Sequence, residues 1–130
     1  MKKLFLSAII SLMTISAFAQ SSFDVPIQNI SADSNIVYRL FSTKNMYTFI
    51  KLNTKNGQMW QVHWDTKGNQ ITTPISLSSR VTNEQEIIGR FFLYPTTNIY
   101  NFLLLDQIDG RVWQVQWSTE PEERIVVPIY

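Results

Sequence analysis

The chain contains no cysteine among its 130 residues, so it can form no disulfide, no thiolate zinc site and no cysteine nucleophile. Its one histidine is His63, so a site with several histidine ligands is excluded, and a serine–histidine triad would have to be built around that one residue. With four glycines there is also no glycine-rich phosphate loop. These absences predict a protein that is not an enzyme, with no catalytic residues, no metal site and no cofactor.

An excess of charge of one sign is lacking as well. Eleven basic and ten acidic residues give a formal charge of +1, and they are spread along the chain. Nucleic-acid-binding proteins instead gather their basic residues into a patch or stripe. We therefore expect no nucleic-acid partner.

The first 20 residues read MKKLFLSAIISLMTISAFAQ. Two lysines, an apolar run from Leu4 to Ala19 and small residues at its end are typical of a secretory signal peptide. The run of 16 residues is short of the roughly 20 that a membrane-spanning helix needs. We predict cleavage after Ala19, which removes Lys2 and Lys3 and leaves a chain with a formal charge of −1. The mature protein is then periplasmic or extracellular and has no transmembrane segment.

The most informative feature present is an internal duplication. Residues 38–64 align without gaps with residues 91–117 at an offset of 53, and eleven of the 27 aligned positions are identical. Self-similarity of this kind indicates two copies of one structural unit. The predicted bounds are 1–19 for the signal peptide, 20–130 for a single β domain, about 36–77 for repeat one and about 87–130 for repeat two.

Each unit reads as four short strands, because aromatic and β-branched residues gather between turn residues and no helical period persists. The expected strands are 37–41, 46–52, 59–64 and 70–77 in the first unit, and 90–94, 99–105, 112–117 and 124–129 in the second. Gly57 and Gly110 lie between apolar runs and mark hairpins. Pro74 and Pro128 lack an amide proton, which predicts that the fourth strand of each unit lies at a sheet edge or is irregular near its proline. The sequence predicts an all-β fold of two four-stranded antiparallel units, packed as a sandwich or a partly closed barrel.

The register of the central hairpin decides which residues share a face. A four-residue loop pairs Asn53 with Gln58 and places Trp64 opposite Tyr47, whereas a three-residue loop brings the alternate residues to the tryptophan side. We favour the four-residue loop, because the Asn53 side chain can accept amide hydrogens from it. One face of each hairpin is then an aromatic ladder, and Gln61 lies on the opposite, outer face.

The second unit carries the motif Thr96-x-Asn98-x-Tyr100-x-Phe102-x-x-Leu105-Asp106, followed by Gly110-x-x-Trp113-Gln114-Val115-Gln116-Trp117. This motif resembles a tandem repeat of an uncharacterised family of small secreted proteins from gut-dwelling Gram-negative bacteria, and the resemblance implies no particular activity. There is a weaker likeness to the blade motif of quinoprotein-type propellers, carried by Asp106 and Gly110. Two units cannot close a ring of roughly 4–8 blades without oligomerisation.

The aromatic ladders support two interpretations. Tyr47, Phe49, Trp60 and Trp64, with their second-unit partners, can form the hydrophobic interior, since large aromatics bury much apolar area. Alternatively, the tryptophans at the strand ends lie open to solvent as stacking platforms for sugar rings or other planar ligands. The candidate ligand-binding residues on that view are Trp64, Trp117, Tyr47 and Tyr100.

We expect an exported, non-catalytic binding or interaction module that recognises a glycan or a protein. An alternative is a structural homo-oligomer or envelope-associated assembly protein, whose strand edges pair between chains. A hydrolase that uses Asp106 or Asp109 is the third class, disfavoured because the equivalent residues of the first unit are Asn53 and Asn56.

Overall fold

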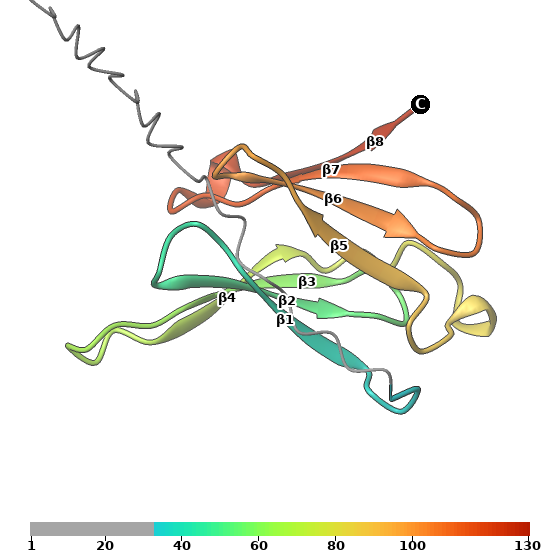
Figure 1. Ribbon diagram of the computed structural model, residues 1–130, viewed down its shortest axis with the longest axis horizontal. Coiled ribbons are helices and arrows are strands. Elements are labelled where there is room, and N and C mark those ends of the chain that lie inside the picture. Colours follow the sequence, from blue (N-terminus) through green and yellow to red (C-terminus); the bar gives the residue numbers. More distant parts are fainter. Residues whose placement is uncertain (1–32) are drawn as a thin grey trace, which may run out of the picture.

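A computed structural model describes residues 33–130; the predicted signal peptide and the start of the mature chain lie outside the described residues. Residues 33–130 form two four-stranded antiparallel sheets and no closed barrel (Figure 1). Sheet one contains β1 (Tyr38–Ser42), β2 (Thr48–Asn53), β3 (Met59–His63) and β4 (Ile71–Ser76), and sheet two contains β5 (Phe91–Pro95), β6 (Asn101–Asp106), β7 (Val112–Gln116) and β8 (Ile125–Ile129). The predicted all-β fold of two similar units is confirmed.

Both sheets are simple meanders in which each strand pairs with the next one along the chain. The proline-containing strands β4 and β8 lie at sheet edges, as predicted. The pairing of β3 with β4 shifts between Met59 and Trp60, where Trp60 lies opposite Pro74. A short 3-10 turn, η1 (Asn83–Gln85), lies in the connection between the sheets, and a second, η2 (Pro121–Glu123), precedes β8.

The predicted four-residue loop is confirmed in both hairpins. In sheet one Phe49 lies opposite Val62, and the Asn53 amide donates to the Gln58 carbonyl at 2.9 Å. The Asn53 side-chain oxygen accepts the Lys55 amide at 3.0 Å, which is the interaction expected of asparagine at that place. The loop ends at Gly57, whose φ of 81° is reached at little cost without a side chain.

Each sheet has two unlike faces. One face carries a tryptophan in both sheets and the other carries a glutamine in both sheets, and we name the faces after these residues. In sheet one the tryptophan face comprises Tyr38, Leu40, Phe49, Lys51, Trp60 and Val62, and the glutamine face comprises Phe41, Ile50, Leu52, Met59 and Gln61. In sheet two the tryptophan face comprises Phe91, Leu93, Phe102, Leu104, Trp113 and Val115, and the glutamine face comprises Tyr94, Leu103, Leu105, Val112 and Gln114. Each residue of one list stands 53 positions from its equivalent in the other sheet.

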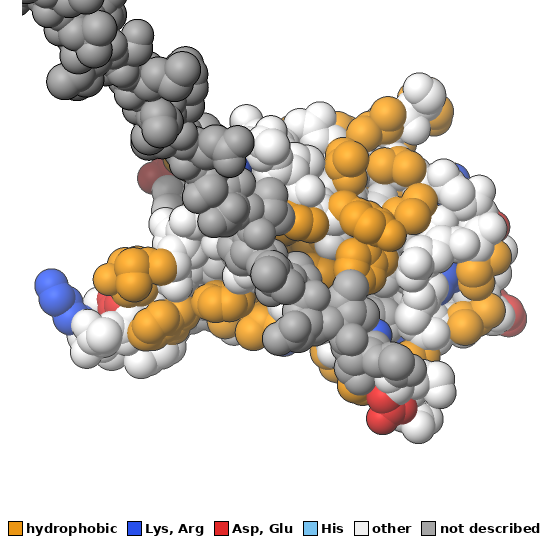
Figure 2. Space-filling view, in the orientation of Figure 1, with side chains coloured by type: hydrophobic (Ala, Val, Ile, Leu, Met, Phe, Trp, Pro, Cys, Tyr) orange, Lys and Arg blue, Asp and Glu red, His pale blue; other side chains and the backbone are white. Residues whose placement is uncertain are grey.

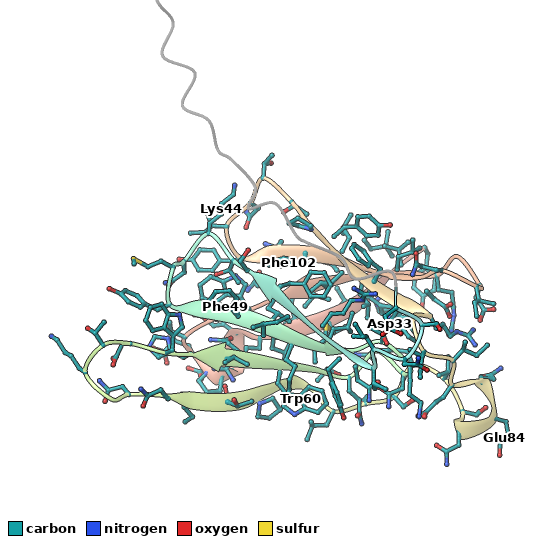
Figure 3. The ribbon with its side chains drawn as sticks, turned by 60° about the horizontal axis from the view of Figure 1, so that its bottom comes forward. Asp33, Lys44, Phe49, Trp60, Glu84 and Phe102 are labelled. Atoms are coloured by element: carbon teal, nitrogen blue, oxygen red, sulfur yellow. The ribbon has the colours of Figure 1, made fainter. Side chains whose placement is uncertain are left out.

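The hydrophobic core joins the glutamine face of sheet one to the tryptophan face of sheet two. Its buried members are Phe41, Ile50, Leu52 and Met59 from the first sheet, and Phe91, Leu93, Phe102, Leu104, Trp113, Val115 and Trp117 from the second unit. Phe102 lies between the two layers in Figure 3, whereas Trp60 lies at the outer surface of sheet one. The two sheets are therefore stacked in the same orientation, and unlike faces meet.

The prediction of an interior built twice from the aromatic ladders is thus wrong for the first unit. In the second ladder Phe102, Trp113 and Trp117 are buried and Tyr100 is exposed. Stacking two sheets in the same orientation can bury one tryptophan face but not both. The placement of Gln61 on an outer face is also wrong: the residue is buried among the sheets, and its Oε1 atom has no hydrogen-bond partner in the described part of the chain.

Hydrogen bonds tie the two sheets together at both ends of the stack. The Phe91 amide, at the start of β5, donates to the Thr54 carbonyl in the β2–β3 turn at 2.9 Å. At the other side, the Arg124 guanidinium donates to the Thr73 hydroxyl of β4 at 2.8 Å. These bonds fix sheet two against sheet one in addition to the apolar contact.

Candidate functional site

The predicted ligand-binding residues Tyr47 and Trp64 meet at one corner of sheet one. Their ring centroids are 5.6 Å apart at an interplanar angle of 64°, an edge-to-face contact that such rings favour. The Trp64 amide donates to the Tyr47 carbonyl at 3.0 Å, and the indole Nε1 donates to the Met46 carbonyl at 3.2 Å. Trp64 is 38% exposed, so this corner offers an aromatic surface to solvent.

The equivalent corner of sheet two brings Tyr100 and Trp117 together with a centroid distance of 5.1 Å. The Trp117 indole donates to the Ile99 carbonyl at 2.9 Å, which repeats the bond made by Trp64. Trp117 is only 2% exposed, however, so the expectation that its ring lies open to solvent is wrong. Tyr100 is exposed and lines, with Gln116 and Glu123 among others, a hollow of about 230 Å³.

An aromatic surface also faces outward on the tryptophan face of sheet one. Tyr38 packs edge-on against Trp60 with their centroids 6.2 Å apart. The Lys51 ammonium lies 4.7 Å from the centre of the Trp60 ring and 5.8 Å from that of Tyr38, within range of a cation–π interaction. Leu40 beside them is 56% exposed. Hydrophobic side chains are visible at the surface over both sheets in Figure 2.

Sequence reasoning missed this surface, although one signal for it is present. Lys51 stands where the second unit has Leu104, which is fully buried. A charged residue rarely takes a fully buried position without a partner. The lysine therefore marks the tryptophan face of the first unit as the one that the other sheet does not cover.

The second outward surface is the glutamine face of sheet two. Leu103 is 36% exposed, and Tyr94 and Val127 beside it are also exposed. The Gln114 side chain donates to the Asn101 side-chain oxygen at 2.8 Å. The glutamine face is therefore exposed to solvent in sheet two, whereas in sheet one it is buried.

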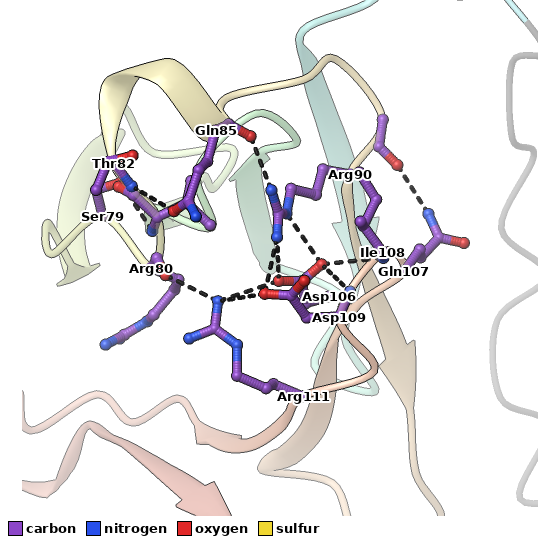
Figure 4. A network of polar contacts seen from close by, with 12 residues as sticks. Ser79, Arg80, Thr82, Gln85, Arg90, Asp106, Gln107, Ile108, Asp109 and Arg111 are labelled. Carbon is purple, nitrogen blue, oxygen red and sulfur yellow. Dashed lines mark hydrogen bonds and ion pairs between the residues drawn. The ribbon is translucent and has the colours of Figure 1, made fainter.

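Asp106 and Asp109, the residues of the hydrolase hypothesis, belong to a polar network at the start of sheet two (Figure 4). Asp106 is fully buried and accepts two hydrogen bonds from the Arg90 guanidinium, both at 3.0 Å. It also accepts the backbone amides of Ile108 and Asp109, at 3.0 and 3.1 Å, and a bond from Arg111 at 3.2 Å. Arg90 in turn donates to the Gln85 carbonyl of η1 at 2.9 Å.

This network holds Asp106 as a carboxylate. Burial acts to raise the pKa of Asp106, but the hydrogen bonds from Arg90, from two backbone amides and from Arg111 outweigh it, so the pKa lies below its ordinary value. The hydrogen bonds that Arg90 donates to Asp106 also raise the pKa of Arg90. The Asp106 carboxylate accepts hydrogen bonds at both of its oxygens and, through Arg90, fastens the β6–β7 turn to the linker between the sheets. Its contacts therefore support a structural role.

Within residues 33–130, no group of three or more histidine, aspartate or glutamate side chains is arranged to hold a metal ion. The same part of the chain contains no helix of the length and apolar character required to span a membrane. Comparison with models of protein families, with curated proteins and with solved structures finds no match to this chain.

Proposed function

We propose that the protein is an exported, non-catalytic interaction module that binds its partner through the outward tryptophan face of sheet one. The observation that carries this proposal is the apolar character of that face. Tyr38, Leu40, Phe49 and Trp60 lie on it together, and their equivalents in sheet two are all buried in the core. A contiguous apolar surface on a folded domain marks an interaction site far more often than isolated exposed residues do.

The chemistry of the face favours a protein partner. It is spread over neighbouring strands of a sheet, and its aromatic residues are of the kind enriched at the centres of protein interfaces. Lys51 adds one positive charge above the Trp60 ring. Small-molecule sites, in contrast, are concave and have a few converging polar groups.

Photo-cross-linking in the producing cells tests this proposal. A benzophenone amino acid at Leu40, on the tryptophan face, is compared with the same amino acid at Lys67, an exposed residue of the β3–β4 loop outside both named faces. We expect a discrete cross-linked product from position 40 and none from position 67. No product from position 40, or the same products from both positions, would refute the proposal.

A glycan is a second candidate partner, because the exposed Tyr47–Trp64 corner offers an indole on which a sugar ring can stack. Affinity electrophoresis against polysaccharides, with Trp64→Ala as the test variant and Ile108→Ser as the control, examines it. Retardation that Trp64→Ala abolishes and Ile108→Ser preserves would support the glycan. Unchanged mobility of the wild-type protein in every polysaccharide would remove it.

Export is part of the proposal and rests on the tripartite pattern of residues 1–20. The protein recovered from producing cells should begin at Gln20 and be found outside the cytoplasm. Amino-terminal sequencing combined with cell fractionation measures both. An amino terminus at Met1 in a cytoplasmic fraction would contradict this part of the proposal.

A further inference from the structure

We infer that the partner of the outward tryptophan face is the outward glutamine face of sheet two in a second copy of this chain. The inference rests on the proposed function, because it names the partner of the same surface. Its basis is that each chain already contains one contact of this kind. The chain covers one tryptophan face with one glutamine face, and it leaves one of each outward.

The two outward faces are equivalents of the two that meet inside. On the tryptophan side the outward residues Tyr38, Leu40, Phe49, Trp60 and Val62 correspond to the core residues Phe91, Leu93, Phe102, Trp113 and Val115. On the glutamine side the outward residues Tyr94, Leu103, Leu105 and Val112 correspond to the core residues Phe41, Ile50, Leu52 and Met59. Hydrophobic character is kept at all nine pairs. Surfaces that resemble the two sides of an existing interface are suited to the same contact between chains.

The turns show the same relationship. A Cβ atom at Gly57 would lie 3.3 Å from the Phe91 ring, because the β2–β3 turn packs on sheet two. A Cβ atom at Gly110 would meet no atom within 4 Å, because no residue of the described part of the chain packs over this glycine. In a second copy the residue equivalent to Phe91 is Tyr38, which is exposed. The β6–β7 turn of one chain can therefore pack on Tyr38 of a second copy, as the turn at Gly57 packs on Phe91 within the chain.

The charge of Lys51 makes the contact between chains weaker than the one inside the chain. Lys51 replaces Leu104, so one positive charge lies on the outward tryptophan face. Cations are accepted near the equivalent ring: the guanidinium carbons of Arg80 and Arg111 lie 5.8 and 5.1 Å from the centre of the Trp113 ring. A lysine can also cover an apolar surface with its stem while the ammonium reaches its edge. Association is then reversible rather than obligate.

The contact between unlike faces limits the kinds of assembly that the chain can form. An interface between unlike faces is heterologous, and repeated head-to-tail contacts either close into a ring or run on as a filament. Each chain contributes two sheets, and rings of stacked four-stranded sheets close with about four to eight of them. We therefore expect two to four copies of the chain.

Light scattering on three proteins tests the inference: the wild-type chain, Leu40→Glu and Leu103→Glu. Both leucines are exposed, at 56% and 36%, and each substitution places a charge in one of the two faces. Each chain is expressed from its full reading frame, purified as the cell processes it, and measured from about 1 μM to about 1 mM. Lys67→Ser, in the exposed β3–β4 loop, serves as the control outside both faces and outside the β6–β7 turn.

We expect the wild-type chain and the control to reach a mass of two, three or four copies, and each leucine variant alone to remain a monomer. A mixture of the two variants should form a dimer that grows no further, because it joins the intact glutamine face of Leu40→Glu to the intact tryptophan face of Leu103→Glu. A Lys51→Leu variant should associate with a Kd at least about tenfold lower than that of the wild type, since it restores the residue of the internal contact.

A wild-type monomer at all concentrations would overturn the inference. So would association that only Leu40→Glu abolishes, because this indicates a symmetric contact between two tryptophan faces, and so would an unlimited filament. If a monomer still gives a position-40 cross-link to another protein, the proposed function stands and the inference alone fails. If a monomer gives no position-40 cross-link to another molecule, both proposals fail.

Discussion

Trp60 and Trp113 occupy the same position in the two hairpins, yet only Trp113 is part of the core. Trp113 lies opposite Leu104 and is 7% exposed, whereas Trp60 lies opposite Lys51 on the outer surface of sheet one. A duplicated sequence has thus produced two environments. The two sheets are stacked in the same orientation. One outer surface of the stack is therefore a tryptophan face and the other is a glutamine face, so only one of the two tryptophans is covered.

The two turn glycines should differ in their tolerance of alanine. Both have positive φ, 81° at Gly57 and 77° at Gly110, so each substitution strains the backbone by about 1 kcal/mol. At Gly57 the added Cβ would also lie 2.8 Å from Arg80 Cγ and 3.3 Å from the Phe91 ring. Urea unfolding should show that Gly57→Ala costs about 1–2 kcal/mol more than Gly110→Ala. Equal losses would mean that the β2–β3 turn does not pack on sheet two.

The buried ion pair predicts unequal effects of two substitutions in one network. Asp106→Asn removes the charge opposite Arg90 and should lower the free energy of unfolding by about 3 kcal/mol, a lower bound for a broken buried pair because Asp109 still contacts Arg90. Arg111→Gln removes a contact whose arginine is 47% exposed and should cost less than about 1 kcal/mol. Urea unfolding at neutral pH measures both. Similar losses for the two variants would contradict the structural role assigned to Asp106.

The lowered pKa of Asp106 also predicts a pH dependence. A carboxyl group whose pKa is lower in the folded state than in the unfolded state stabilises the fold above the unfolded-state pKa, and the contribution disappears as the pH falls through the folded-state value. The unfolded-state value is about 3.9. The difference in urea midpoint between the wild-type protein and Asp106→Asn should therefore be constant from pH 7 to about pH 5 and shrink below about pH 4. A difference that does not change with acidification would show that Asp106 does not carry this charge-dependent stability.

The glutamines of the two units provide a further matched pair. Gln61 is buried with an Oε1 atom that has no hydrogen-bond partner in the described region, whereas Gln114 lies outward and donates to Asn101. Gln61→Met keeps the volume and removes the unsatisfied oxygen, so it should raise the free energy of unfolding by about 1 kcal/mol. Gln114→Met should give no gain. The urea midpoints of the two variants test this prediction. A lower free energy of unfolding for Gln61→Met would mean that the polar groups of Gln61 stabilise the fold beyond what its packing contributes.

The sequence was sufficient to predict the strands, their order and the hairpin register, because these follow from local signals. The repeated turn at Gly57 and the ability of Asn53 to accept loop amides select a four-residue loop, and the loop then fixes every pair in the hairpin. The prolines of β4 and β8 placed both strands at sheet edges for the same local reason.

Which face of each sheet is buried could not be read in the same way. The repeat makes the two units alike, so the alternation within each strand predicts two equal ladders, and nothing local states which ladder the other sheet covers. Lys51 in place of Leu104 was the one residue that separated the units on this point. The corner residues show the consequence: Trp64 and Trp117 make the same hydrogen bond, but only Trp64 is substantially exposed.

The stacking of unlike faces is tested most directly by the unfolding free energies of Trp60→Ala and Trp113→Ala, measured with urea at a protein concentration where the chain is monomeric. Trp113→Ala should lose about 3–5 kcal/mol, as expected for a large side chain removed from a core, and Trp60→Ala about 1 kcal/mol. Losses of equal size at the two positions would place both tryptophans in the same environment and contradict the account.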